Sequence, residues 1–153
     1  MNREFVHSLL NKIVKIDRGG PESRVGMILG AENDYLILLT AEDGVVYYQL
    51  HHIKSITQDS QDSMTLNVEV PENFEFVTGV DFRSVLNGLR NAWVKINRGG
   101  PEALEGVLQE VTNDYVTIVA NKEVVRVALF HIRNISYGLK LEKVEKDAGG
   151  NNE

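Results

Sequence analysis

The chain has 153 residues, of which 42% are hydrophobic and 25% are charged, and its net charge is −6 at pH 7. It contains no cysteine, which excludes disulfide bonds and thiolate metal sites. No stretch is long and apolar enough to span a bilayer, and the N-terminus lacks the apolar run of a signal peptide. We therefore expect a protein that is made and kept in a cytoplasm and has no membrane partner.

One segment accounts for the net negative charge. Residues 58–81 carry six acidic groups and no basic one, which equals the net charge of the whole chain. The remainder is close to neutral and shows no basic face that would neutralise a phosphate backbone. Nucleic acid is therefore a disfavoured partner.

The chain contains the same segment twice. KIDRGGPESRVGMI (residues 15–28) recurs as KINRGGPEALEGVL (residues 95–108), and the similarity extends to HIKSI and HIRNI. Features shared by both copies indicate architecture, whereas an active site needs its residues only once. Units of about 55 residues bury little surface, so we expect the copies to pack on each other or on other molecules. The predicted organisation is a first repeat over residues 1–57, an acidic linker over 58–77, a second repeat over 78–138 and a disordered tail over 139–153.

Each repeat is predicted to begin with an amphipathic helix of about three turns, too short to persist without packing. Asn2 can cap the first helix, and Thr78 or Asp81 can cap the second. The apolar residues at helical spacing are Phe5, Val6, Leu9, Leu10 and Ile13 in the first helix, and Phe82, Val85, Leu86 and Leu89 in the second.

Four β-strands and a final short strand follow each helix. Pro21 and Pro101 indicate a turn after the first strand, and Gly26 and Gly106 indicate a bend or bulge in the second. The third strand of the first copy is apolar nearly throughout, as expected for burial on both faces, and Asp43-Gly44 predicts a hairpin turn. The predicted strands are residues 13–16, 25–31, 35–39 and 45–50 in the first copy, and 93–96, 104–111, 115–119 and 124–129 in the second.

This pattern predicts a mainly β fold with two tandem, SH3-like barrels of the Sm-like type. Each barrel has five strands and is preceded by a short N-terminal helix. Between the barrels, the segment SMTLNVEV alternates apolar and polar residues. It is equally compatible with an extra edge strand and with an extended linker.

The repeated motif positions are the candidate site residues, and we interpret them as structural. The RGGPE glycines could cradle an anion, but neither loop has the lysine or the strand–loop–helix context of a phosphate loop, so a rigid turn is favoured. His52 and His131 lack further ligands at diagnostic spacing, so we expect neither a metal nor a cofactor. The positions are Arg18, Gly19, Gly20, Pro21, Glu22, Tyr35, His52, Arg98, Gly99, Gly100, Pro101, Glu102, Tyr115 and His131.

The residues do not predict catalysis. Ser23 and Ser55 have no base beside them in sequence, and the second copy replaces them with Ala103 and Asn134. The tyrosines admit two interpretations, a stacking platform for single-stranded nucleic acid or core and interface residues. Tyr35 recurs in the second copy but the Tyr47-Tyr48 pair does not, which favours the core and interface interpretation.

The motif KIxRGGPExxxGxL, followed by DYxxL and then by VVYYQLHHIKSIT, resembles the N-terminal repeats of the spore coat protein B family of Bacillus endospores. The resemblance covers the chain from Phe5 to about Gly138, and RGGPE with HIKSI or HIRNI occurs in it twice. Family members commonly continue into a long Ser- and Lys-rich tail, which these residues do not include.

The resemblance implies a non-catalytic structural protein. It would be made in the mother-cell cytoplasm, deposited in the spore outer coat, and bound there to other coat proteins and to itself. The alternative, which rests on analogy with the fold, is an Sm-like RNA-binding or regulatory module.

Overall fold

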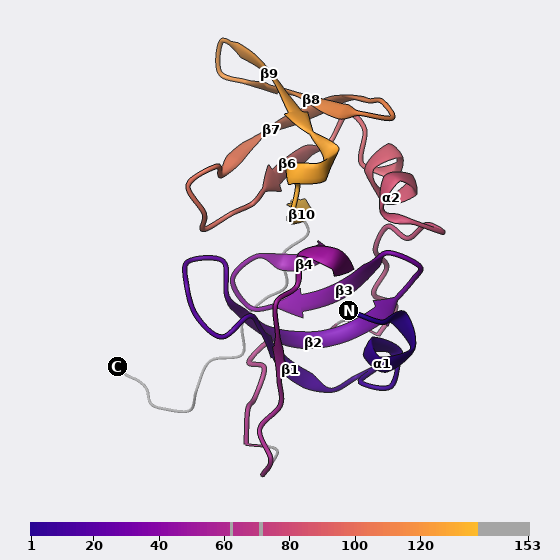
Figure 1. Ribbon diagram of the computed structural model, residues 1–153, viewed down its shortest axis with the longest axis vertical. Coiled ribbons are helices and arrows are strands. Elements are labelled where there is room, and N and C mark those ends of the chain that lie inside the picture. Colours follow the sequence, from indigo (N-terminus) through magenta and orange to yellow (C-terminus); the bar gives the residue numbers. More distant parts are fainter. Residues whose placement is uncertain (62, 71, 138–153) are drawn as a thin grey trace.

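The computed structural model describes residues 1–61, 63–70 and 72–137 (Figure 1). The secondary structure is mainly β, as predicted, and the two halves have the same order of elements. The first half contains α1 (Arg3–His7), β1 (Ile13–Ile16), β2 (Arg24–Ala31), β3 (Tyr35–Thr40), β4 (Gly44–Gln49), the 3₁₀ turn η1 (Leu50–His52) and β5 (Ile56–Thr57). The second half contains α2 (Phe82–Gly88), β6 (Trp93–Ile96), β7 (Leu104–Val111), β8 (Tyr115–Ala120), β9 (Glu123–Ala128), η2 (Leu129–His131) and β10 (Asn134–Tyr137).

The helices begin where they were predicted to begin but are shorter than three turns. Asn2 caps α1 by accepting hydrogen bonds from the N–H groups of Glu4 and Phe5, and the Asp81 side chain caps α2. The chain reverses just after each helix at Asn11 and Asn91, whose φ angles are 66° and 71°. Asparagine tolerates this left-handed conformation, which ends each helical segment. Neither described helix has the length and apolar character to cross a membrane.

The described strands form one open antiparallel sheet with the order β5-β1-β2-β3-β4-β10-β6-β7-β8-β9. The prediction of two closed Sm-like barrels is therefore not confirmed. Closing a five-stranded barrel would pair the fourth and fifth strands of one half. Instead β4 pairs with β10 of the other half, in the register Val46↔Ser136, Tyr47↔Ile135 and Tyr48↔Asn134. In the first half a physical reason lies in β5, which has only two residues and pairs with β1. In the second half β10 pairs with β6 and β4 and not with β9.

Two of the predicted glycines serve close packing within the sheet. A Cβ on Gly26 would collide with the carbonyl oxygen of Leu39, and one on Gly106 would collide with that of Val119. The irregularity of the second strand lies a few residues later, between Ile28 and Gly30 and at the equivalent place in the second half. The glycines therefore let the second and third strands cross closely, and the bulge bends the sheet beyond them.

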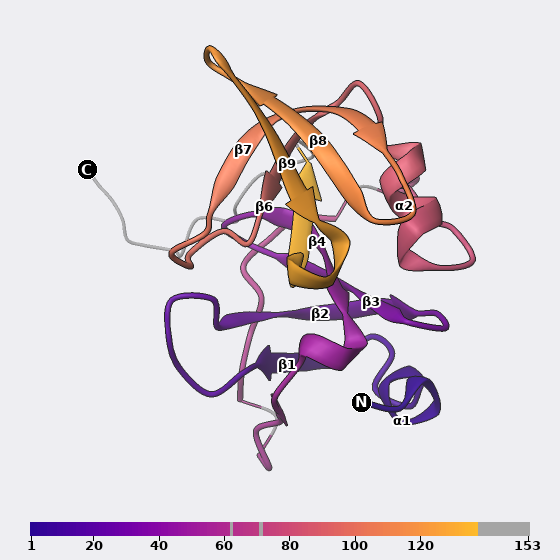
Figure 2. The same cartoon turned by 45° about the horizontal axis from the view of Figure 1, so that its top comes forward.

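The strong curvature of the sheet produces two apolar clusters, and one of them is shared by both halves. Leu36 and Leu38 of β3 belong to the first cluster, which contains residues of the first half only. Ile37 and Leu39 of the same strand belong to the second cluster, together with α2, β6 and β10. The third strand is thus buried on both faces, as predicted, because the second half covers its outer face (Figures 1 and 2).

The connector between the halves, residues 58–81, packs on the shared cluster. Its described residues contain no strand, although Val68 forms an isolated bridge. Its apolar side chains Leu66, Phe74, Phe76 and Val77 lie against the cluster shared by the two halves. The predicted disordered tail, residues 139–153, lies outside the described residues.

Equivalent isoleucines in the two halves allow a matched test of this architecture. Ile135 pairs with Ile96 inside the sheet and is fully buried, whereas Ile56 pairs with Ile16 on an edge strand and is half-buried. We predict that Ile135→Ala lowers the free energy of unfolding by about 2–5 kcal/mol and that Ile56→Ala lowers it much less. Urea unfolding of the two variants measures the difference. Equal losses would contradict a core that spans the halves.

Candidate functional site

The two RGGPE loops, Arg18–Glu22 and Arg98–Glu102, meet at the boundary between the halves. A Cβ on Gly99 would collide with the carbonyl group of Pro21, so the backbones of the loops are in contact. Gly20 and Gly99 have φ angles of 87° and 97°, which favour glycine. These two glycines occupy different positions in the motif. The same five residues therefore form two different tight turns that pack on each other.

A buried carboxylate joins the loops to the rest of the boundary. Asp43 is 7% exposed and accepts hydrogen bonds from Arg24 Nε at 2.8 Å and from Arg98 Nη1 at 2.6 Å. Arg24 also donates from Nη1 to the Tyr48 hydroxyl at 3.0 Å and from Nη2 to the Arg98 carbonyl at 2.7 Å. Burial alone would lower the pKa of Arg24, but Tyr48 and Asp43 raise it above its usual value. Asp43 therefore serves as the shared counterion of an arginine from each half.

A second ion pair crosses the boundary beside the first. Glu22 accepts from Arg133 Nε at 2.9 Å, and its other carboxylate oxygen lies 2.5 Å from Nη2 of the same arginine. The hydrogen bond that Arg133 donates to Glu22 raises the pKa of Arg133. This geometry is bidentate, which gives the pair directional specificity as well as charge attraction.

Polar side chains of the first half also bind backbone groups of η2. Gln49 Nε2 donates to the carbonyl oxygens of Leu129 and Ile132 at 3.1 and 2.6 Å. His52 Nε2 lies 2.6 Å from the carbonyl oxygen of Phe130, and burial lowers the pKa of His52. Among the residues that the structure describes, no group of three His, Asp or Glu side chains is placed to hold a metal ion.

The tyrosines of the first half are core residues that also fix the connector. Tyr35 and Tyr47 are fully buried, with ring centroids 6.1 Å apart. The Tyr35 hydroxyl donates to the Gly79 carbonyl at 2.7 Å, and the Tyr47 hydroxyl donates to the Val77 carbonyl at 2.5 Å. The rings of Tyr35 and Tyr47 are therefore not available for stacking on a nucleic acid, and the core and interface interpretation is confirmed for these two residues.

The structure places the two members of each duplicated pair in different environments. Glu22, Arg98 and His52 make the contacts described above. Their counterparts in the other half, Glu102, Arg18 and His131, are exposed. Tyr35 is buried, whereas its counterpart Tyr115 is partly exposed. Equivalence in sequence therefore does not give equivalence of environment.

Several boundary residues were not among the predicted site residues because they occur in one copy only, and of these Tyr48 alone had been interpreted as a core or interface residue. The strand registers align Arg24 with Leu104, Tyr48 with Val127 and Gln49 with Ala128. Asp43 lies in the turn that is shorter in the second copy, and its hairpin signal concealed its role as a counterion. A search for polar residues that differ between the copies would have found all four.

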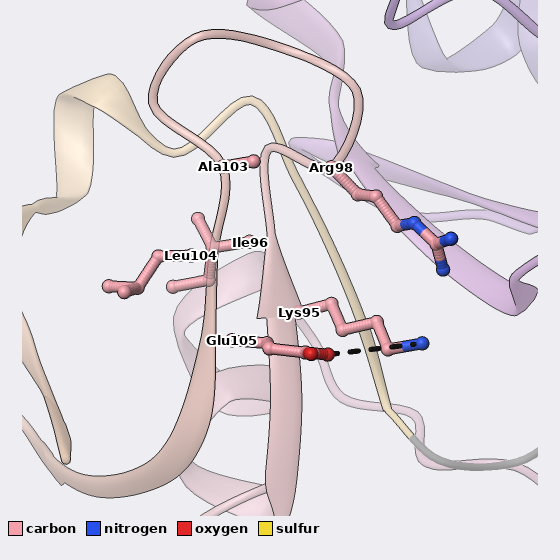
Figure 3. A pocket seen from close by; sticks show the side chains of 6 residues that line it. All are labelled: Lys95, Ile96, Arg98, Ala103, Leu104 and Glu105. Carbon is pink, nitrogen blue, oxygen red and sulfur yellow. Dashed lines mark ion pairs between the residues drawn. The ribbon is translucent and has the colours of Figure 1, made fainter. Parts of the chain in front are cut away.

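A shallow hollow lies beside the second RGGPE loop. Its volume is about 280 Å³, and it is lined by Lys95, Ile96, Arg98, Ala103, Leu104 and Glu105 (Figure 3). Lys95 and Glu105 form an ion pair of 4.0 Å at its side. The Arg98 side chain extends toward the first half, where it binds Asp43 (Figure 3). The hollow is smaller than typical small-molecule sites, and its charged groups are paired.

The buried counterion gives a direct test of the boundary. Removing the charge of Asp43 leaves Arg24 buried and unpaired, so Asp43→Asn should lower the free energy of unfolding by about 3–5 kcal/mol. Glu42→Gln, in the same turn at an exposed position, should change it by less than about 0.5 kcal/mol. Urea unfolding of both variants measures the effects. Similar stabilities would show that the carboxylate does not hold the boundary.

Comparisons with known proteins agree with the resemblance noted in the motifs. The family model described as the YwrJ third domain matches residues 4–56, which is the first repeat. The chain is 44% identical over 136 residues to spore coat protein B of Bacillus subtilis strain 168. This alignment covers 89% of the chain but 35% of the relative, so the chain spans about a third of the length of the curated relative it matches. No solved structure matches the chain. The resemblance to spore coat protein B that RGGPE and HIKSI predicted is thereby confirmed over nearly the whole chain.

Proposed function

We propose that this protein is a non-catalytic structural component of the bacterial endospore coat. It is made in the mother-cell cytoplasm, deposited in the spore outer coat and held there by contacts with other coat proteins. The observation that carries the proposal is the 44% identity to spore coat protein B over 89% of the chain. Because the chain spans a third of that relative, the proposal concerns the part that the two proteins share.

The use of the duplicated residues supports a structural role. Polar groups that could have formed a reactive centre are engaged in packing the halves together: Glu22 with Arg133, and Arg98 with Asp43. The buried tyrosines Tyr35 and Tyr47 hold the backbone of the connector through their hydroxyl groups. The contacts of these residues are those of a scaffold.

The surface of the second half supports contacts with proteins. Phe130 is 67% exposed, Val124 is 55% exposed and Trp93 is 50% exposed. Exposed aromatic and aliphatic side chains of this size are typical of protein interfaces, where they bury apolar area with little loss of rotamer entropy. We propose that coat proteins bind over this half.

Localisation tests the proposed function. A fluorescent fusion under its own promoter in a sporulating Bacillus host should be expressed late in sporulation, in the mother cell, and should collect around the forespore. The fusion carrying Asp43→Asn should be depleted from purified coats, because its boundary is broken, and the fusion carrying Glu42→Gln should be retained. Constitutive expression with diffuse fluorescence in the mother cell would contradict the proposal.

A further inference from the structure

The sheet ends in two edge strands that are the counterparts of the strands paired at the boundary. At the boundary, β4, the fourth strand of the first half, pairs with β10, the fifth strand of the second. The two ends of the sheet are β9, the fourth strand of the second half, and β5, the fifth strand of the first. Among the described residues, one boundary is thus formed, and the two edge strands that could form a second one have no partner on their outer sides.

We propose that β9 of one chain pairs with β5 of a second copy, so that copies join head to tail through the same arrangement that joins the repeats. This inference rests on the proposed assembly function and names the chain itself as a partner. The contact is heterologous, since two different surfaces meet. It therefore propagates into a closed ring or an open filament, depending on the rotation between copies.

The internal boundary fixes the register of the proposed contact. Ile56 and Ile135 are equivalent because they pair with the equivalent residues Ile16 and Ile96. Tyr47 and Arg126 are also equivalent. The first residue of β3, Tyr35, pairs with Gln49, and the first residue of β8, Tyr115, pairs with Ala128. Tyr47 and Arg126 each lie two residues before these partners. The internal pairs therefore translate into Thr57↔Val125, Ile56↔Arg126 and Ser55↔Val127 between copies.

The edge of the second half is exposed and has room beside it for an added strand. Every residue of β4 is buried, whereas β9 alternates between exposed and partly buried residues. A hollow of about 490 Å³ lies beside β9 and the second RGGPE loop, and Glu102, Leu104, Val125 and Val127 are among its lining residues. In the first half, the equivalent surface is filled by the second half. An edge strand of six residues without proline is also a ready template for strand addition.

Charge complementarity of the internal boundary is retained at the open ends. The internal pair joins Glu22 to Arg133. The equivalent positions are Glu102, beside β9, and Lys54, just before β5, and both are exposed. Neither forms an ion pair within the described part of the chain. An acidic and a basic group are therefore left at the places where a second copy would join them.

The two helices give independent support for the proposed contact between copies. The equivalent turns at Asn11 and Asn91 align Phe5 of α1 with Val85 of α2. Val85 is fully buried in the cluster shared by the halves, whereas Phe5 is 48% exposed. The face of α1 that carries Phe5 is thus equivalent to the face that α2 buries in the shared cluster. A second copy joined through β5 would cover Phe5 in the same way.

The contact between copies should be weaker than the internal boundary. The cluster of Arg24, Tyr48 and Asp43 has no polar equivalent at the open end, where Leu104 and Val127 replace the first two residues. Arg126 stands in place of the buried Tyr47, so its charged group must reach solvent past the added strand. We therefore expect reversible association that depends on protein concentration.

Cysteine cross-linking of the purified full chain tests the proposal, because the chain has no cysteine of its own. Opposed residues of antiparallel strands have Cα atoms about 4.5–5.5 Å apart, within the range of a disulfide. A mixture of Thr57→Cys and Val125→Cys chains should give a disulfide dimer under mild oxidation, while neither variant alone should. The double variant Val46→Cys/Ser136→Cys, which bridges the internal boundary, should cross-link within one chain and shows that the geometry is competent.

Two further experiments test the register of the contact and its ion pair. Mixing Thr57→Cys with Val124→Cys, one position out of register, should give little dimer. Lys54→Glu and Glu102→Lys should each weaken association in sedimentation velocity, and the double variant Lys54→Glu/Glu102→Lys should restore it. Absence of cross-linking in the first mixture, or equal cross-linking of Thr57→Cys with itself, would overturn the head-to-tail contact. Such a failure would leave the localisation result, and with it the coat function, unchanged.

Discussion

The pairing of β4 with β10 is the interaction on which the rest of the structure depends. It places a strand of the second half against the open edge of the first, and so turns two five-stranded sheets into one sheet of ten strands. It also brings the outer face of β3 and β4 under the second half, where Tyr35, Ile37, Val45 and Tyr47 enter the shared cluster. A repeat of this size buries little apolar area by itself, and the shared cluster provides additional buried apolar area to both halves.

The duplication makes the boundary asymmetric, and this asymmetry limits what could be predicted from the sequence. The helix starts, the strands, the RGGP turns and the burial of the third strand on both faces follow from local patterns and were predicted correctly. The closed barrels were not confirmed, because a sequence shows that the fourth strand needs a partner but not which strand provides it. The shortness of β5 was predicted, but the pairing of β4 with β10 of the other half was not.

The candidate site shows the same limitation more sharply. Comparing the copies identified Glu22, Arg98 and His52, which lie at the boundary, but gave equal weight to their exposed counterparts. It overlooked Arg24 and Asp43, which occur in one copy and form the buried part of the contact. Residues shared by both copies build each repeat, whereas residues that differ between the copies decide how the repeats join.

Hydrogen exchange of backbone amides measures the pairing of β4 with β10 most directly, because β9 serves as an internal reference. At a concentration where the chain is monomeric, amides of Val46 to Tyr48 and of Asn134 to Ser136 should exchange slowly and together, at the rate of global unfolding. The outward amides of β9, the equivalent strand without a partner, should exchange much faster. Equal and fast exchange in β4 and β9 would contradict the account, because it would show that the two halves are not joined into one sheet.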